Sequence, residues 1–142
     1  MPYQLCYCSI CRKQQGGGGY AINLAAVTSS LRVEGGSTLG LYRARIEDDE
    51  HASCELSSGE RRFCTRCGSG LWLFDPSWPD LIHPFASAID TELPVAPSRV
   101  HLMLKYKASW VVPDIGPDDA TFDLYPEKSI EDWHKDARQW VA

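Results

Sequence analysis

The chain has 142 residues, of which 44% are hydrophobic and 23% are charged, values typical of a single globular domain. Its formal net charge of −5 argues against a broad nucleic-acid interface, because phosphate binding needs clustered Lys and Arg side chains. No apolar run approaches the ~20 residues that span a bilayer, and no signal peptide precedes the first cysteines. We therefore expect a cytoplasmic protein without membrane or nucleic-acid partners, whose oligomeric state the sequence leaves open.

The apolar pattern predicts a mainly β domain with antiparallel sheets. Short or alternating apolar runs predict strands over residues 20–27, 31–33, 39–46, 81–89 and 100–106, with a turn over residues 34–37. Near the end of the chain, Ser129 is a suitable N-cap, and Glu131 and Asp132 fall in the first turn that would follow it. A single C-terminal helix is therefore expected from Ser129 to about Trp140, packed outside the sheets.

Five of the six cysteines fall in two tight clusters. Cys6, Cys8 and Cys11 form a C-x-C-x-x-C, while Cys64 and Cys67 form a C-x-x-C within a predicted hairpin. Such spacing brings sulfurs together without a long loop closure, which suits a soft divalent metal such as zinc. A disulfide is the alternative for either cluster, although a reducing compartment disfavours it. We predict that all five cysteines are metal ligands, with the second cluster forming a zinc knuckle.

The chemistry of the first cluster follows from its number of ligands. Three thiolates leave one tetrahedral position open on zinc, and an open position is typical of catalytic sites. A small thiol such as glutathione could bind there as a thiolate and attack an aldehyde carbon. Arg12 and Lys13 could attract its carboxylates, and Gly16 and Gly17 could let a peptide-like ligand approach the backbone. The alternatives are solvated surface charges at Arg12 and Lys13 and a plain loop over residues 16–19.

Four segments carry a resemblance to a known family. Residues 6–13 read C-Y-C-S-I-C-R-K and resemble the C-H-C-S-x-C-R-K signature of the glutathione-dependent formaldehyde-activating enzymes, a family that includes centromere protein V. Residues 63–69 resemble its F-C-x-x-C-G-S motif, residues 87–90 its G-S-L-D segment, and residues 107–110 its K-x-x-W. The resemblance implies a β-tent fold with zinc and a carbon–sulfur lyase activity like that of S-hydroxymethylglutathione synthase. Cys6, Cys8 and Cys11 would then form the catalytic site.

The sequence departs from the family pattern at its start. Family members carry a further C-x-C upstream, which joins the C-x-x-C in a four-cysteine structural zinc site. Here the chain begins only five residues before Cys6, so we expect one domain over residues 1–142 that lacks this strand and starts late relative to its relatives. Cys64 and Cys67 would then form half of a site. His51 and Cys54 are the nearest spare ligands, but Cys54 is expected to be a buried or half-buried strand residue.

Three functions fit these observations. The first is a zinc-dependent enzyme that activates a glutathione-like thiol toward formaldehyde or another electrophile. The second is a non-catalytic, zinc-stabilised binding module, and the third is an inactive, shortened family member. The remaining histidines are weaker candidates: we expect His83 and His101 to be packed or surface residues on strands, and His134 to face solvent on the helix.

Overall fold

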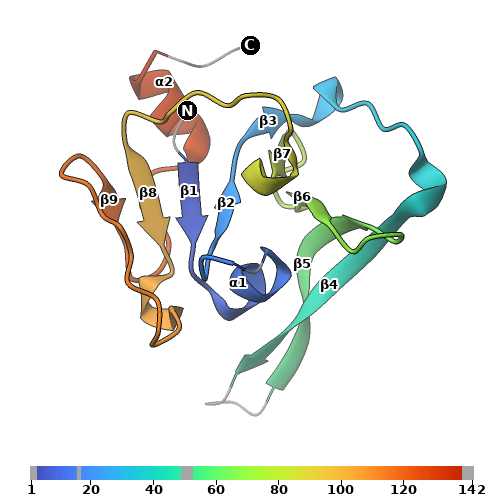
Figure 1. Ribbon diagram of the computed structural model, residues 1–142, viewed down its shortest axis with the longest axis horizontal. Coiled ribbons are helices and arrows are strands. Elements are labelled where there is room, and N and C mark those ends of the chain that lie inside the picture. The colour runs from blue at the N-terminus through green and yellow to red at the C-terminus, as the bar shows by residue number, and fades with distance from the viewer. Residues whose placement is uncertain (1–2, 16, 49–52, 139–142) are drawn as a thin grey trace.

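The computed structural model describes residues 3–15, 17–48 and 53–138, which form two β-sheets and two short α-helices (Figure 1). The first sheet has the strand order β2-β1-β8-β9. Its strands are β1 (Tyr3–Cys6), β2 (Ala21–Asn23), β8 (Arg99–Leu102) and β9 (Ala120–Thr121). Strand β1 lies inside this sheet, antiparallel to β2 and parallel to β8. The strand that leads into the first cysteine cluster is therefore held from both sides.

The second sheet has five strands in the order β3-β7-β6-β5-β4, and every pairing in it is antiparallel. Its strands are β3 (Ala26–Val27), β4 (Leu39–Asp48), β5 (Ser53–Cys64), β6 (Gly70–Phe74) and β7 (Leu81–Pro84). Strands β4 and β5 form a long hairpin whose far end extends away from the rest of the molecule (Figure 1). The pairing shifts between Arg43 and Arg45, where a bulge lets the hairpin bend.

The helices lie at different places on this framework. Helix α1 (Ser9–Gln15) follows β1 directly and lies between the two sheets in the view of Figure 1. Helix α2 (Ile130–Asp136) packs at the other end of the first sheet, where Gln4, Val100 and Trp133 line a common hollow. Single turns of 3-10 helix occur at η1 (Thr28–Ser30), η2 (Gly36–Thr38), η3 (Ala86–Ala88) and η4 (Leu104–Tyr106).

The core between the sheets contains the first cysteine cluster. Its buried residues are mostly contributed by the first sheet and α1: Cys6, Cys11, Ala21, Phe85, Val100 and Leu102. Leu73 of β6 packs against them from the second sheet. A second cluster of Leu5, Tyr7 and Val111 lies on the opposite side of β1, as the alternation of side chains along a strand requires. Because side chains on both faces of β1 are buried, the strand holds Cys6 in a fixed position.

The mainly β architecture with a C-terminal helix is confirmed, but several boundaries were wrong. Residues 31–33 form no strand, and the strands expected over 81–89 and 100–106 end at Pro84 and Leu102, where 3-10 turns follow. The first sheet contains parallel pairs, which sequence reasoning did not anticipate. Strand β1 and helix α1 were also missed, because each is too short to show a periodic pattern.

Helix α2 begins as predicted and ends early. The Ser129 hydroxyl oxygen accepts a hydrogen bond from the Asp132 N–H at 3.0 Å, as an N-cap does. Regular helix stops at Asp136, and Arg138 takes a positive φ of 55°, so the helix does not continue to Trp140, which lies outside the described residues. His134 is buried, which contradicts the expected solvent-facing position; its Nδ1 is 2.7 Å from the Ile130 carbonyl oxygen.

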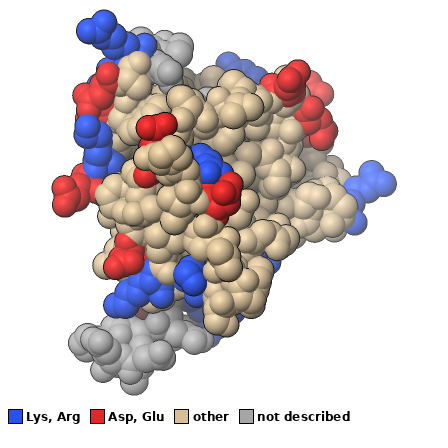
Figure 2. All heavy atoms as spheres, turned by 60° about the vertical axis from the view of Figure 1, so that its left-hand side comes forward, with Lys and Arg blue, Asp and Glu red and all other residues tan. Residues whose placement is uncertain are grey.

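The molecular surface mixes charges of both signs. On the face shown in Figure 2, acidic and basic side chains are interspersed around a wide uncharged area. Neither α-helix in the described part of the chain has the length and apolar character that crossing a membrane requires.

Hydrogen bonds to Asp119 join β9 and the preceding turn to β8. Its carboxylate accepts hydrogen bonds from the Arg99 N–H at 2.6 Å, from the Arg99 Nε at 2.9 Å and from the Gly116 N–H at 2.8 Å. His101 Nε2 lies 3.2 Å from the same carboxylate. Burial alone would raise the pKa of Asp119, but these hydrogen bonds outweigh it and hold the pKa well below its usual value.

Replacing Asp119 by Asn should therefore destabilise the protein by about 1–3 kcal/mol, because charge-assisted hydrogen bonds are lost in a mostly buried site. Because the folded state lowers this pKa, the stabilisation is present above the ordinary carboxylate pKa of 3.8 and is lost as pH falls below it. Urea unfolding from neutral to acidic pH should show the gap between the two proteins narrowing. Asp118→Asn is the control, and an equal loss there would contradict the assignment.

Candidate functional site

The three cysteines of the first cluster are positioned by one strand end and one helix start. Cys6 is the last residue of β1 and pairs with Ala21 on one side and Leu102 on the other. The chain then reverses into α1, with Cys8 immediately before the helix and Cys11 in its first turn. The Cys8 carbonyl accepts the Arg12 N–H at 3.1 Å, and the Cys8 sulfur accepts the Cys11 N–H at 3.3 Å. Cys8 thus caps the helix with its own sulfur.

The three sulfurs converge as their spacing predicted. The Sγ atoms of Cys6, Cys8 and Cys11 all lie within 4.8 Å of one another, and no other group of three or more metal-ligating residues occurs in the part of the chain that the structure describes. Cys6 and Cys11 are buried and Cys8 is half-buried. A separation of this size is compatible with one shared ion, since Zn–S bonds are about 2.3 Å long.

The pKa values of the three thiols differ, so that Cys8 ionises readily and Cys6 and Cys11 do not. Hydrogen bonds with the Cys11 and Cys6 side chains, and then with backbone N–H groups, hold the pKa of Cys8 well below its usual value. The same contacts with Cys11 and Cys8, together with burial, raise the pKa of Cys6 far above its usual value. For Cys11, the bond with Cys6 lowers the pKa, but the bond with Cys8 and burial prevail and raise it to about 11. Ionisation of all three thiols, two of them buried, therefore needs a nearby cation.

The cluster fits a soft divalent metal. The donor set is three sulfurs, which zinc accepts, and a cation among them would offset the charge that otherwise keeps Cys6 and Cys11 protonated. Three ligands from the chain would leave a fourth position for another group. The structure thus places a possible metal-binding group where the spacing predicted it, and zinc itself stays a prediction.

A buried hydrogen-bond network lies on the side of β1 opposite the cysteine cluster. Tyr7 lies between Cys6 and Cys8 but points to the opposite side of β1, with 0% of its surface exposed. Its hydroxyl is 2.9 Å from His101 Nδ1, and His101 in turn reaches Asp119. The two rings stack at 5.8 Å between centroids. This hydrogen-bond network was not predicted from the sequence. Tyr7 and His101 are 94 residues apart and His101 and Asp119 are 18 residues apart, so no local sequence pattern connects them.

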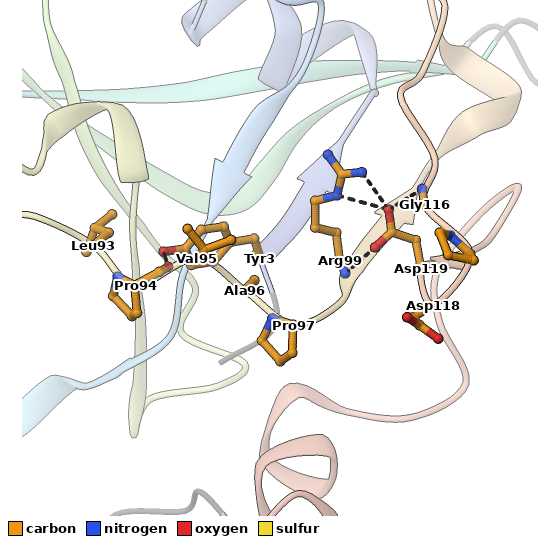
Figure 3. A pocket seen from close by; sticks show the side chains of 11 residues that line it. Tyr3, Leu93, Pro94, Val95, Ala96, Pro97, Arg99, Gly116, Asp118 and Asp119 are labelled. Atoms are coloured by element: carbon orange, nitrogen blue, oxygen red, sulfur yellow. Dashed lines mark hydrogen bonds and ion pairs between the residues drawn. The ribbon is translucent and has the colours of Figure 1, made fainter.

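The same network reaches a cavity of about 480 Å³ at the other end of β1 and β8 (Figure 3). Tyr3 and Arg99 face each other across this end of the sheet, whereas Cys6 and Leu102 form the opposite end of the same two strands. Figure 3 shows the Arg99 guanidinium turned toward Asp119 and the Gly116 backbone. Arg99 and Asp119 in this cavity wall thus already have partners, and the wall lies at the opposite end of β1 and β8 from the sulfurs.

The predicted ligand-binding residues lie in different environments. Arg12 is half-buried on α1, and its Nε is buried without a hydrogen-bond partner in the described residues, whereas Lys13 is exposed. Gly17 is exposed at a φ of 56°, and an added Cβ would meet nothing within 4 Å, so this position needs glycine for its backbone conformation alone. Gly16 lies outside the described residues. Gly17 thus has no close neighbour in this structure that would require glycine for the approach of a ligand.

Gln15, at the end of α1, lies beside two other segments. Ser87, in the segment 87–90, donates a hydrogen bond from its hydroxyl to Gln15 Oε1 at 2.7 Å. Gln15 Nε2 lies beside Gly70, which follows the segment 63–69, and a Cβ added at Gly70 would come within 2.3 Å of it, so the Gln15 side chain would have to shift. The segments 63–69 and 87–90 therefore approach the end of the helix that carries Cys11.

The second cysteine pair lies on a tight turn at the end of β5. The Gly68 N–H donates to the Cys64 carbonyl at 2.8 Å, and Gly68 takes the expected positive φ of 77°. The Cys67 sulfur lies 3.2 Å from the Ser69 hydroxyl. In the described residues, neither Cys64 nor Cys67 belongs to a group of three ligands. Cys54 lies on β5 as predicted, but it is exposed rather than buried, and His51 is outside the described residues.

Comparisons with known proteins give a family profile, a sequence relative and a solved structure. The sequence profile of the family described as glutathione-dependent formaldehyde-activating enzyme matches residues 1–105. A protein of Halomonas elongata, provisionally named a glutathione-dependent formaldehyde-activating enzyme, is 52% identical over 133 residues, covering 94% of this chain and 81% of that protein. A crystal structure of a Rhodobacter sphaeroides protein matches with a TM-score of 0.45 and 25% identity, over 65% of this chain and 72% of that one.

Metal analysis of cysteine variants tests the site. We expect the purified protein to bind about one zinc ion per chain, the number that one three-sulfur cluster holds. Cys6→Ser, Cys8→Ser and Cys11→Ser should each weaken zinc affinity at least about 100-fold, because a ligand is lost outright. Mass spectrometry for zinc, with competition by a chelator, gives both quantities.

Cys54→Ser and Cys67→Ser serve as matched controls and should retain the metal. Two tightly held zinc ions per chain, one of them lost in Cys67→Ser, would contradict the half-site interpretation of Cys64 and Cys67. Retention of zinc in all three variants of the first cluster would contradict the site itself.

Proposed function

This chain belongs to the family of glutathione-dependent formaldehyde-activating enzymes, and from that premise we propose that it joins glutathione to formaldehyde at the cluster of Cys6, Cys8 and Cys11. The observation that carries the proposal is the convergence of three sulfurs, two of them buried, within 4.8 Å. A zinc ion held there would keep a bound thiol deprotonated near neutral pH. The reaction class is that of a carbon–sulfur lyase acting in the direction of adduct formation.

The proposed reaction is balanced without a further reactant. The glutathione thiol loses its proton, and its sulfur forms a bond to the formaldehyde carbon. The π electrons of the C=O bond move to oxygen, which takes up a proton, so that S-hydroxymethylglutathione is the product. The chain's contribution is to bind the thiol beside its three sulfurs, hold it in the ionised form and orient it for attack.

The ligand-binding residues have separate roles in this proposal. Arg12 lies one residue after Cys11 on α1 and is half-buried, so the accessible part of its guanidinium can bind a carboxylate of glutathione close to the cluster. Lys13 is exposed and would act from the rim, with a smaller, salt-sensitive effect. Gly16 and Gly17 would shape the loop that follows the helix. The peptide part of the substrate would then lie over the end of α1.

The activity test uses the exchange between free and hydroxymethylated glutathione. In solutions of glutathione and formaldehyde, NMR exchange spectroscopy should show faster interconversion with the protein than without it. Cys8→Ser should abolish the acceleration, because Cys8 is both a cluster sulfur and the cap of α1. Cys54→Ser should leave it unchanged, since Cys54 is exposed and lies near the far end of β5 from Cys64.

No acceleration by the zinc-loaded wild-type protein would reject the enzyme and favour the zinc-stabilised binding module. Acceleration that persists in Cys8→Ser would place the reaction elsewhere.

A further inference from the structure

Arg61 is directed from the second sheet toward the core that holds the cysteines. It lies on β5, where it pairs with Tyr42 on β4 and Leu73 on β6. Leu73 packs against the core cluster that includes Cys6 and Cys11. Because directly paired residues share a face of a sheet, Arg61 enters the same core. An added Cβ at Gly59 would come within 3.4 Å of Arg61 Nη1, so the side chain runs along this inner face.

Two nitrogens of the Arg61 guanidinium are buried without a hydrogen-bond partner in the described residues. Only 6% of the residue is exposed, and its Nε and Nη1 have no hydrogen-bond partner in the part of the chain that the structure describes. The next residue, Arg62, is directed to the opposite face and pairs with Glu60 at 3.1 Å. A buried, unpaired charge opposes folding unless an anion joins it. Arg61 is therefore the side chain in this core that still lacks its anion.

The packing of the two sheets places Arg61 and the sulfurs around one region. Leu73, the direct neighbour of Arg61 on β6, packs against the buried core cluster that contains Cys6 and Cys11, and Cys8 packs against the same cluster. Arg61 is therefore directed from the second sheet toward the core that holds all three sulfurs.

We propose that Arg61 supplies the positive charge that stabilises the anionic sulfur of the thiol ligand beside Cys6, Cys8 and Cys11. The proposal rests on the function proposed above. Three cysteine thiolates already exceed the charge of one divalent ion, and a fourth thiolate adds a further negative charge to a buried site. A fixed guanidinium lowers the cost of that addition. It would also favour the alkoxide that develops on the aldehyde oxygen during attack.

The burial of Arg61 points to the reacting sulfur as its anion and not to a carboxylate of glutathione. Both Nε and Nη1 are out of contact with solvent, whereas the carboxylates of a bound tripeptide lie some distance from its sulfur. Arg12 on α1 is only half-buried and remains the better candidate for a carboxylate. Arg61 is thus assigned to the sulfur of the ligand and Arg12 to a carboxylate. The two effects can be measured separately with one thiol that carries carboxylates and one that carries none.

Calorimetric titration of the zinc-loaded protein with glutathione and with 2-mercaptoethanol tests this assignment. Arg61→Met should weaken binding of both thiols by a similar factor, roughly ten- to a hundredfold, as expected for one charge in a partly desolvated site. Arg61→Lys should recover most of the affinity. The matched control is Arg62→Met, on the same strand but the opposite face, which should bind both thiols like the wild type.

The outcomes separate this inference from the proposed function. If the wild type binds neither thiol, the proposed function fails and the role of Arg61 fails with it. If the wild type binds both but Arg61→Met binds them equally well, or loses only glutathione, the Arg61 assignment alone is wrong.

Thermal unfolding of the metal-free wild type and Arg61→Met separates the proposed role of Arg61 from a purely structural one. The two roles predict opposite changes in melting temperature. Removal of an unpaired buried charge should leave Arg61→Met as stable as the wild type or more stable. A clear loss of stability would instead show that Arg61 is held by the fold itself, and the assignment would be overturned.

Discussion

The convergence of three sulfurs in a small, largely buried space is the constraint on which the rest of the site depends. Cys6, Cys8 and Cys11 lie within 4.8 Å of one another, and their hydrogen bonds and burial allow Cys8 to ionise while Cys6 and Cys11 resist. Such a cluster becomes fully ionised only beside a positive charge. A divalent metal would supply most of that charge, and the buried guanidinium of Arg61 adds to it from the facing sheet.

The fold meets this constraint by fixing both ends of the cluster. Strand β1 is paired on both edges, so Cys6 cannot move away from the other sulfurs without breaking the sheet. Tyr7 anchors the reversal after Cys6 to His101, and Asp119 holds His101 and the turn around it. Asp119 thereby belongs to a network that reaches Tyr7, the residue between Cys6 and Cys8. Stability and site geometry are coupled here, since the network that positions the motif also joins β9 to β8.

The local parts of this arrangement could be predicted from the sequence, and the distant parts could not. The spacing of Cys6, Cys8 and Cys11 fixes their convergence within one turn of chain, and the cap at Ser129 likewise depends on neighbouring residues. Arg61 carries no such signal, because its role arises from the pairing of β5 with β6 and the packing of two sheets. His134 shows the same limit: a polar residue on a short helix was expected outside, and tertiary packing buries it.

X-ray absorption spectroscopy of the zinc-loaded protein tests the central claim most directly, because it counts the sulfur atoms around the metal. The account predicts three sulfur neighbours from Cys6, Cys8 and Cys11 in the absence of thiol. Addition of glutathione should raise the count to four, at Zn–S distances of about 2.3 Å. Four sulfur neighbours before any thiol is added, with no change afterwards, would mean a closed structural site and would contradict the account.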